Sequence, residues 1–485
     1  MAFFQVALFL LASFYYFTLI SCRPAGVHLR SMDNFIDAVR QVEESNPGLS
    51  PLALVRALRR TAGHDDAMTI HFLGAWNNLT DAEGLETDIL NASSFSFFDK
   101  AVHHIVTDSG EERGVTLTRD GTTVALAPLL LGIESGLKAK LESTSAVGLF
   151  PLTLGRTLGL TFLSLQDIPV SNRLGPDGCW DSVEHPKVFK LSWPATLATD
   201  AVISGGMDGI ILGTDISRVP ESEKPRALSE TLKEYYSFTL NASQGLDTFP
   251  GHVSPRRREI SRSILEPLDL QKELMDTLEL VWKLEKTEWV ALDTGVNEAV
   301  KKGLEAFVHK YWDCPQIISR CQWRAKAHKG TPIPLSLPLG FLYIHHTYEP
   351  SQPCLSFSEC SRDMRAMQRF HQEVRNWSDI GYSFVVGSDG YVYEGRGWNI
   401  LGRHTRGHNS LGFGVSIIGN YTSTLPSRHS LDLVRHRLTS CAVGGGKLVA
   451  NYTFHGHRQT VNYTSCPGDA FFNEITQWDH FRHYH

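Results

Sequence analysis

The chain has 485 residues, a length that suggests two or three domains. Its content of 42% hydrophobic and 20% charged residues is typical of a globular protein. The formal net charge of −6 gives no indication of a nucleic-acid partner. The charge is unevenly distributed: from Cys314 onward there are 17 Lys and Arg against 11 Asp and Glu, and before it 29 against 41. Thirteen of the 21 His also follow Cys314, so we expect two units with different roles.

The N-terminus carries a long apolar run, residues 3–20, followed by Ser21-Cys22-Arg23-Pro24. This pattern predicts a signal peptide over residues 1–21 and a secreted, extracellular protein. The run is long and no Lys or Arg precedes it, so an uncleaved membrane anchor is the alternative. Asn-X-Ser/Thr triplets mark glycosylation only in a secreted chain, and seven of them support secretion; they begin at Asn78, Asn91, Asn241, Asn376, Asn420, Asn451 and Asn462.

Residues 22–305 are predicted to be a mainly helical region, and nothing in them indicates its role. Apolar spacing predicts helix from residue 32 to about 60, with a break at Pro47-Gly48. Residues 121–165 are rich in Leu and Gly. They lack the roughly 18–20 apolar residues in a row that a membrane span needs, so we expect buried helices and no stable span. Residues 251–263 are expected to be an exposed loop or linker, and 267–310 a long helix.

Residues 306–485 are predicted to form an α/β domain in which helices flank a mixed central β-sheet and loops carry the site. A buried strand over 341–344 ends at His345, and Ser358 is expected to cap the next helix. Further strands are expected over 382–386, 391–393 and 413–418, the first two joined by a hairpin turn. A helix with 431–441 and a final helix over 468–478 complete the domain.

Three residues in this domain form a candidate metal site: His345, His457 and Cys466. Two imidazoles and a thiolate give zinc (Zn²⁺) three ligands and leave a fourth position for water, which is the pattern of a catalytic site. Each residue taken singly favours a structural role, and Cys466 alone would more often be a disulfide partner. His346 is expected to point to the opposite strand face, but His455 could share a face with His457 and is a competing ligand. A zinc peptidase is disfavoured because His-Glu-X-X-His is absent.

Five segments together resemble the peptidoglycan recognition protein domain, which is related to the zinc amidases of the bacteriophage lysozyme type. They are residues 341–347 (Phe-Leu-Tyr-Ile-His-His-Thr), 380–398, 407–410, 412–415 and 456–459 (Gly-His-Arg-Gln). The resemblance covers about residues 314 to 478. With its long N-terminal extension and signal, the whole chain is similar to the long secreted vertebrate members of this family.

The resemblance implies a secreted, zinc-dependent N-acetylmuramoyl-L-alanine amidase of innate immunity. Its substrate would be the lactyl-L-alanine amide bond of bacterial peptidoglycan, and its partners peptidoglycan and muropeptides. It also implies His345, His457 and Cys466 as the ligands, Tyr382 beside the metal-bound water and Thr464 beside the reacting carbonyl. Groove residues carried over by position are His371, Arg375, Asn376, Trp377, His404 and Asn409. The alternative is a non-catalytic peptidoglycan-binding protein, but such members usually lack the cysteine ligand, which this chain keeps.

Three further expectations depend on the same resemblance. Asn376-Trp377 mixes the pairs found in lysine and diaminopimelate binders, so this pair does not indicate which stem peptide is preferred, and a glycan on Asn376 is not expected. The interval from His457 to Cys466 is one residue longer than the family usually shows, which could loosen the metal site or displace Thr464. The eight Cys leave three disulfides and a free Cys466 if Cys22 is removed with the signal. Family pairing implies Cys354–Cys360 and Cys314–Cys441, and elimination adds Cys179–Cys321.

Overall fold

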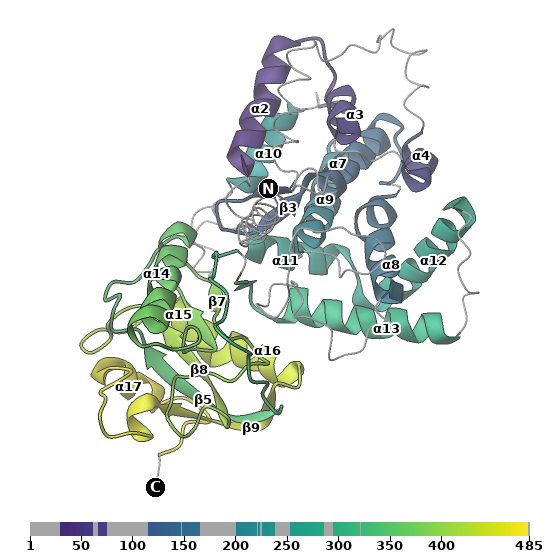
Figure 1. Ribbon diagram of the computed structural model, residues 1–485. Helices are drawn as coiled ribbons and strands as arrows, with labels where there is room; N and C mark the ends of the chain where they lie inside the picture. Colours follow the sequence, from purple (N-terminus) through teal and green to yellow (C-terminus); the bar gives the residue numbers. More distant parts are fainter. Residues whose placement is uncertain are drawn as a thin grey trace, which may run out of the picture.

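A computed structural model of the chain shows a helical region lying against a sheet domain (Figure 1). The predicted signal peptide, the Cys179–Cys321 pair and the triplets at Asn78, Asn91 and Asn241 lie outside the described residues. The structure describes residues 30–61, 66–74, 115–146, 148–164, 200–220, 222–223, 226–237, 253–285, 294–320 and 322–483.

The helical region consists of packed helices and one small three-stranded sheet, β1-β2-β3. Its strands are β1 (Arg30–Ser31), β2 (Val115–Leu117) and β3 (Thr123–Ala125). Its helices are α2 (Met32–Ser45), α3 (Pro51–Thr61), α4 (Ala67–Leu73), α7 (Leu126–Leu141), η3 (Pro151–Gly155), α8 (Arg156–Ser164), α9 (Asp200–Arg218), α10 (Leu228–Tyr236), α11 (Ser254–Ile264), α12 (Pro267–Glu285), α13 (Thr294–Val308) and η6 (His309–Asp313).

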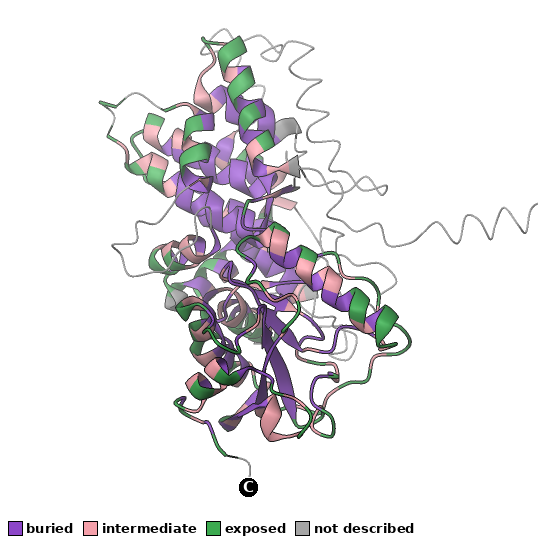
Figure 2. Cartoon of the chain, turned by 90° about the vertical axis from the view of Figure 1, so that its left-hand side faces the viewer, coloured by how far each residue is buried: buried purple, intermediate pink, exposed green. Residues whose placement is uncertain are grey.

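Helices α7 and α9 are largely buried, and Figure 2 shows buried residues concentrated along the central helices of this region. Helices α7 and α9 approach closely because glycines meet at their contact: a Cβ on Gly132 would lie 2.2 Å from the Gly209 carbonyl oxygen. The prediction of buried helices within residues 121–165 is therefore confirmed. Within the described part of the chain, no helix combines the length and hydropathy needed to cross a bilayer.

The prediction of an exposed loop over residues 251–263 is wrong, because α11 begins at Ser254. Arg257 is buried and forms an ion pair with Asp208, with 2.6 Å between Nε and Oδ1 and 2.8 Å between a terminal nitrogen and Oδ2. The hydroxyls of Tyr235 and Tyr236 donate to the same carboxylate. A buried, fully paired Arg cannot be distinguished from a solvated one by local composition, which is why the run of three Arg was misleading.

Two expected boundaries also differ. The long helix expected over 267–310 is two helices, α12 and α13, whose described residues end at Glu285 and resume at Thr294. The cap of the first helix in the sheet domain is Ser356 and not Ser358, since the Ser356 hydroxyl accepts the backbone N–H of Glu359 at 3.3 Å. The chain therefore enters this helix two residues earlier than predicted.

The sheet domain is built on six strands in the order β4-β7-β6-β8-β5-β9. All neighbours are parallel except β6 and β7, which form the predicted hairpin, so the mixed sheet is confirmed. The strands are β4 (Ile317–Ile318), β5 (Leu339–His346), β6 (Phe384–Val386), β7 (Val392–Glu394), β8 (Gly412–Ile417) and β9 (Leu448–Gly456).

Helices cover both faces of this sheet. Leu342 and Ile344 of β5 point into the core under α15 (Arg428–Asp432), η8 (Leu433–Leu438), α16 (Thr439–Gly444) and α17 (Asp469–Ile475). The opposite face meets α14 (Phe357–Arg369), which continues as η7 (Phe370–Val374), over β6 and β7. Because strand residues alternate, Tyr343 and His345 point to the face opposite that of Leu342 and Ile344.

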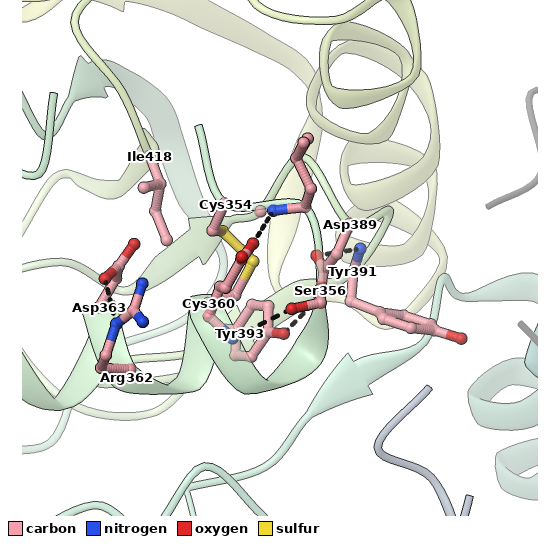
Figure 3. Close-up of a disulfide and its surroundings, with 12 residues drawn as sticks. Cys354, Ser356, Cys360, Arg362, Asp363, Asp389, Tyr391, Tyr393 and Ile418 are labelled. Carbon is pink, nitrogen blue, oxygen red and sulfur yellow. Dashed lines mark hydrogen bonds and ion pairs between the residues drawn. A yellow bond between two sulfur atoms is a disulfide. The ribbon is translucent and has the colours of Figure 1, made fainter. Parts of the chain in front are cut away.

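Both family-implied disulfides are present. Cys314–Cys441 joins the end of η6 to α16, and Cys354–Cys360 holds the start of α14. Figure 3 shows the second bridge beside Tyr393, whose hydroxyl donates to the buried carboxylate of Asp389 at 2.5 Å. Cys466 is the free cysteine of the described residues, and it is buried.

The helical region contacts the sheet domain through Asp120, in the turn between β2 and β3. The buried carboxylate of Asp120 accepts the Tyr391 hydroxyl at 2.7 Å and the N–H groups of Val253 and Ser254 at the start of α11. Next to it, Gly121 packs so closely on Phe357 of α14 that a Cβ would lie 2.3 Å from the ring. One buried carboxylate therefore joins the hairpin, α11 and the sheet domain.

Candidate metal centre

The structure brings the three predicted ligands together from three places in the chain. His345 lies near the end of β5, His457 begins the 3₁₀ turn η9 (His457–Gln459) directly after β9, and Cys466 precedes α17. One ligand atom from each lies within 4.8 Å of the others. The Cys466 Sγ is 3.6 Å from His345 Nδ1, and the two imidazole centroids are 4.5 Å apart.

The donor set fits a zinc ion. The Nε2 atom of His457 is buried and has no hydrogen-bond partner among the described residues, which an inward-facing ligand nitrogen explains. Burial lowers the pKa of His345 well below its usual range and that of His457 to about 4, so both imidazoles are neutral at physiological pH. Burial raises the pKa of the Cys466 thiol to about 12, so metal binding would release its proton. Neutral imidazoles and a thiolate are ligands that zinc accepts.

The two competing histidines lie elsewhere. His346 points away, and its Nδ1 accepts the backbone N–H of Tyr421 at 3.1 Å. The ring of His455 packs near Phe341 and Tyr343, with centroids 5.5 and 6.1 Å away. In the described part of the chain, His455 belongs to neither of the two close groups of metal-ligand atoms. The second group, His309 with Cys314 and Cys441, has its sulfurs joined in a disulfide.

Tyr382 and Thr464 border the three ligand residues. The ring centroid of Tyr382 is 5.3 Å from that of His345. Burial, and then the proximity of Cys466, raise the pKa of Tyr382 above its ordinary value, so the phenol keeps its proton and can donate a hydrogen bond. The Thr464 hydroxyl accepts the backbone N–H of Cys466 at 3.1 Å, which leaves the hydroxyl proton to be donated to another group.

The longer interval between His457 and Cys466 is closed by Arg458. Its backbone N–H donates to the Cys466 carbonyl at 2.9 Å, and its guanidinium donates to the Ser465 carbonyl and to Asp469 Oδ1 at 2.7 Å. The guanidinium also lies over the Phe472 ring, 4.9 Å from the centroid. The extra residue therefore leaves His457 and Cys466 facing each other, and Thr464 stays hydrogen-bonded beside them.

Three of the predicted groove residues lie around the end of η7. His371 and Trp377 stack with centroids 4.6 Å apart and planes 16° apart, and Arg403 lies over the Trp377 ring at 5.3 Å. Arg375 is exposed with its guanidinium 5.4 Å from the Phe370 centroid, where it can meet an anionic ligand.

Asn376, next to this stack, is exposed with a φ of 51°. Asn adopts this left-handed conformation more readily than most residues, which suits it to the turn after η7.

His404 and Asn409 lie on a loop against β8. The His404 ring packs on Gly414, where a Cβ would lie 2.1 Å from the ring, so only glycine leaves it room. The Asn409 side-chain oxygen accepts the backbone N–H groups of His404 and Thr405, both at 2.8 Å. Asn409 therefore shapes the loop that presents His404, a role that its position in the motif did not indicate.

Sequence reasoning missed three residues near the centre: Arg403, Thr405 and Arg458. Each acts through a tertiary contact, which periodicity and ligand spacing do not report. The available signal was adjacency, because each directly follows or precedes a predicted site residue or segment: Arg403 and Thr405 flank His404, and Arg458 follows His457.

Comparisons with known proteins agree with this site. The family model described as N-acetylmuramoyl-L-alanine amidase matches residues 336–469, which include His345 and Cys466. The N-acetylmuramoyl-L-alanine amidase of Mus musculus is 36% identical, covering 93% of this chain and 94% of its own length. That of Homo sapiens is 36% identical over 93% of this chain and 90% of its own.

Another relative matches a smaller share of this chain. Peptidoglycan-recognition protein LB of Drosophila melanogaster is 40% identical over 35% of this chain and 71% of its own length. The two mammalian relatives, in contrast, extend through the helical region as well. The chain therefore belongs to the N-acetylmuramoyl-L-alanine amidase family of peptidoglycan recognition proteins.

Proposed function

We propose that the chain is a secreted, zinc-dependent amidase that cleaves the lactyl-L-alanine bond of bacterial peptidoglycan, with residues 306–485 as the catalytic domain. The observation that carries this proposal is the convergence of His345, His457 and Cys466 within 4.8 Å, with a buried His457 nitrogen that lacks another partner in the described residues. The names of the mammalian relatives state the reaction, and that of the insect relative states the ligand.

His345, His457 and Cys466 would hold the zinc ion. When bound, zinc lowers the pKa of a coordinated water towards neutrality and polarises a carbonyl. Tyr382, kept protonated by burial, donates a hydrogen bond to the carbonyl oxygen as negative charge develops on it. A preorganised donor of this kind typically contributes about 2.7–4 kcal/mol to transition-state stabilisation. Thr464, fixed by its bond to the Cys466 N–H, can donate its hydroxyl proton to the same region.

The groove residues would position the muropeptide. The exposed guanidinium of Arg375 suits a stem-peptide carboxylate through paired hydrogen bonds. The rings of His371 and Trp377 stack on each other, and the Arg403 guanidinium lies over the Trp377 ring. Burial lowers the pKa of His371 to about 4, so its imidazole is neutral at physiological pH. Arg375 and Arg403 would therefore supply positive charge for an anionic stem.

The proposal is tested by mass spectrometry of defined muramyl peptides incubated with the purified full-length protein. We expect release of the free stem peptide by the wild type, its loss after removal of the metal by a chelator, and its recovery when zinc is added back. Cys466→Ser should retain muropeptide binding and release no stem peptide, and the exposed Ser423→Ala serves as a control with wild-type activity. Binding without cleavage by the wild type would instead assign the chain as a non-catalytic receptor.

Secretion is tested separately. We expect the chain expressed in animal cells to accumulate in the medium with its N-terminus near residue 22, as N-terminal sequencing would show. Retention in the membrane fraction with residues 1–21 intact would assign the apolar run as an anchor.

A further inference from the structure

We propose that Thr405 is a positioning residue of the metal centre. Its hydroxyl fixes the orientation and tautomer of His345 and connects this ligand to His404 in the groove wall. The inference rests on the proposed zinc site. Thr405 is neither one of the three candidate metal ligands nor one of the predicted substrate-binding residues.

A metal bound to His345 Nδ1 would leave one assignment of protons in this hydrogen-bonded group. His345 Nδ1 faces the Cys466 sulfur at 3.6 Å, and its Nε2 lies 3.3 Å from the Thr405 hydroxyl oxygen. A nitrogen that binds a metal carries no proton, so the neutral His345 ring must hold its proton on Nε2 and donate it to Thr405. Thr405 then has one proton to donate, and His404 Nδ1 lies 3.0 Å away as its acceptor. His404 is therefore protonated on Nε2.

The surroundings hold the Thr405 hydroxyl in place. Thr405 has no solvent exposure, so water has no access to replace its hydroxyl. Its backbone N–H and that of His404 both donate to the Asn409 side-chain oxygen, and its carbonyl accepts the backbone N–H of His408 at 3.0 Å. The His404 ring is pressed against Gly414 on its other side. The three-residue chain from His345 through Thr405 to His404 is thus built into the fold.

Removing the hydroxyl has a defined consequence for the ligand. Thr405→Val keeps the shape of the side chain but leaves the buried Nε2–H of His345 without a hydrogen-bond acceptor. The His345 ring would then favour a rotated position or the tautomer that has its proton on Nδ1. Either change competes with metal binding. Loss of such an outer hydrogen bond typically lowers metal affinity about 10–100-fold. Thr405→Ser keeps the hydroxyl and should restore affinity to within a few-fold of the wild type.

A matched control separates this effect from the general cost of changing a buried threonine. Thr439 is also buried, and its hydroxyl donates to the Arg435 carbonyl in η8, on the side of the sheet opposite the metal centre. Thr439→Val removes one buried hydroxyl by the same chemical change and should leave metal affinity unchanged.

The experiment titrates metal-free full-length proteins with Zn²⁺ against a chromophoric chelator, and with Co²⁺ while recording visible and near-ultraviolet spectra. We expect Thr405→Val to lose affinity about 10–100-fold and to alter the Co²⁺ ligand-field bands, and Thr405→Ser and Thr439→Val to match the wild type. Equal affinity and spectra for wild type and Thr405→Val would overturn the inference. If Thr405→Val does not fold by circular dichroism, Thr405→Ala compared with Thr405→Ser decides by the same criterion. Failure of the wild type itself to bind either metal would contradict the zinc site and not the role of Thr405.

Discussion

Gly414 on β8 offers a sharp test of how the His404 loop packs on the sheet, because a single methyl group there meets His404. A Cβ at this position would lie 2.1 Å from His404 Cγ and 2.5 Å from both neighbouring ring atoms. Carbon atoms in contact lie about 3.5–4.0 Å apart, so the ring must move by more than 1 Å. The ring is not free to do so, because Thr405 holds its Nδ1 and Asn409 holds its backbone.

We therefore expect Gly414→Ala to lower the free energy of unfolding by about 1–3 kcal/mol, the usual cost of overpacking a buried site. The matched control is Gly340→Ala on the neighbouring strand β5, where an added Cβ meets nothing within 4 Å. It should change stability by no more than about 0.5 kcal/mol. The displaced His404 should also raise the KM for muramyl peptides in Gly414→Ala and not in Gly340→Ala.

The assay is urea unfolding monitored by tryptophan fluorescence and far-ultraviolet circular dichroism, with the free energy extrapolated linearly to water. Kinetics on a defined muramyl peptide at saturating zinc supply KM. If Gly414→Ala and Gly340→Ala have the same stability and the same KM, then His404 is not fixed against β8 as described, and its predicted role in substrate binding is refuted.

Three further outcomes are expected. Burial raises the pKa of Asp389 to about 7, so between about pH 4 and 7 the folded chain holds a proton that the unfolded chain has lost. The free energy of unfolding should therefore fall as pH rises through this window. Urea unfolding of Asp389→Asn at pH 5, 6 and 7 should lack this contribution, which is about 1.4 kcal/mol per pH unit. Asp120→Asn should leave donors at the junction of the two regions without an acceptor, and each such donor should lower the free energy of unfolding by about 1–3 kcal/mol. A thermal unfolding midpoint close to that of the wild type would contradict this. Arg458→Ala should reduce zinc content after dialysis because the loop before Cys466 loses its closure, whereas Arg428→Ala, on the exposed start of α15, should not.

Much of the sheet domain could be predicted because its signals are local. The apolar run before His345, the hairpin turn after Val386 and the spacing of the later helices each reflect burial or turn chemistry within a few residues. The three candidate ligands were also accessible, because the family resemblance names these positions and few residue types bind zinc. What decided between His455 and His457 was the end of β9, which turns the chain between these two residues.

The features that escaped prediction depend on tertiary contacts. The Arg-rich segment is a buried helix because Asp208, some 50 residues away in sequence, pairs with Arg257. Thr405 matters because β5 and the following loop bring His345 beside it, 60 residues apart in sequence. Arg458 closes a longer loop through Asp469 and Phe472 of α17. No periodicity or motif spacing contains these pairings, so only the fold reveals them.

X-ray absorption at the zinc edge of the purified wild-type protein tests the central claim most directly, because it reports the atoms bound to the metal. We expect one zinc per chain, with one sulfur at about 2.3 Å and nitrogen or oxygen neighbours at about 2.0–2.1 Å, and loss of the sulfur shell in Cys466→Ser. A spectrum without sulfur in the wild type, or a sulfur shell unchanged in Cys466→Ser, would contradict a centre made by His345, His457 and Cys466.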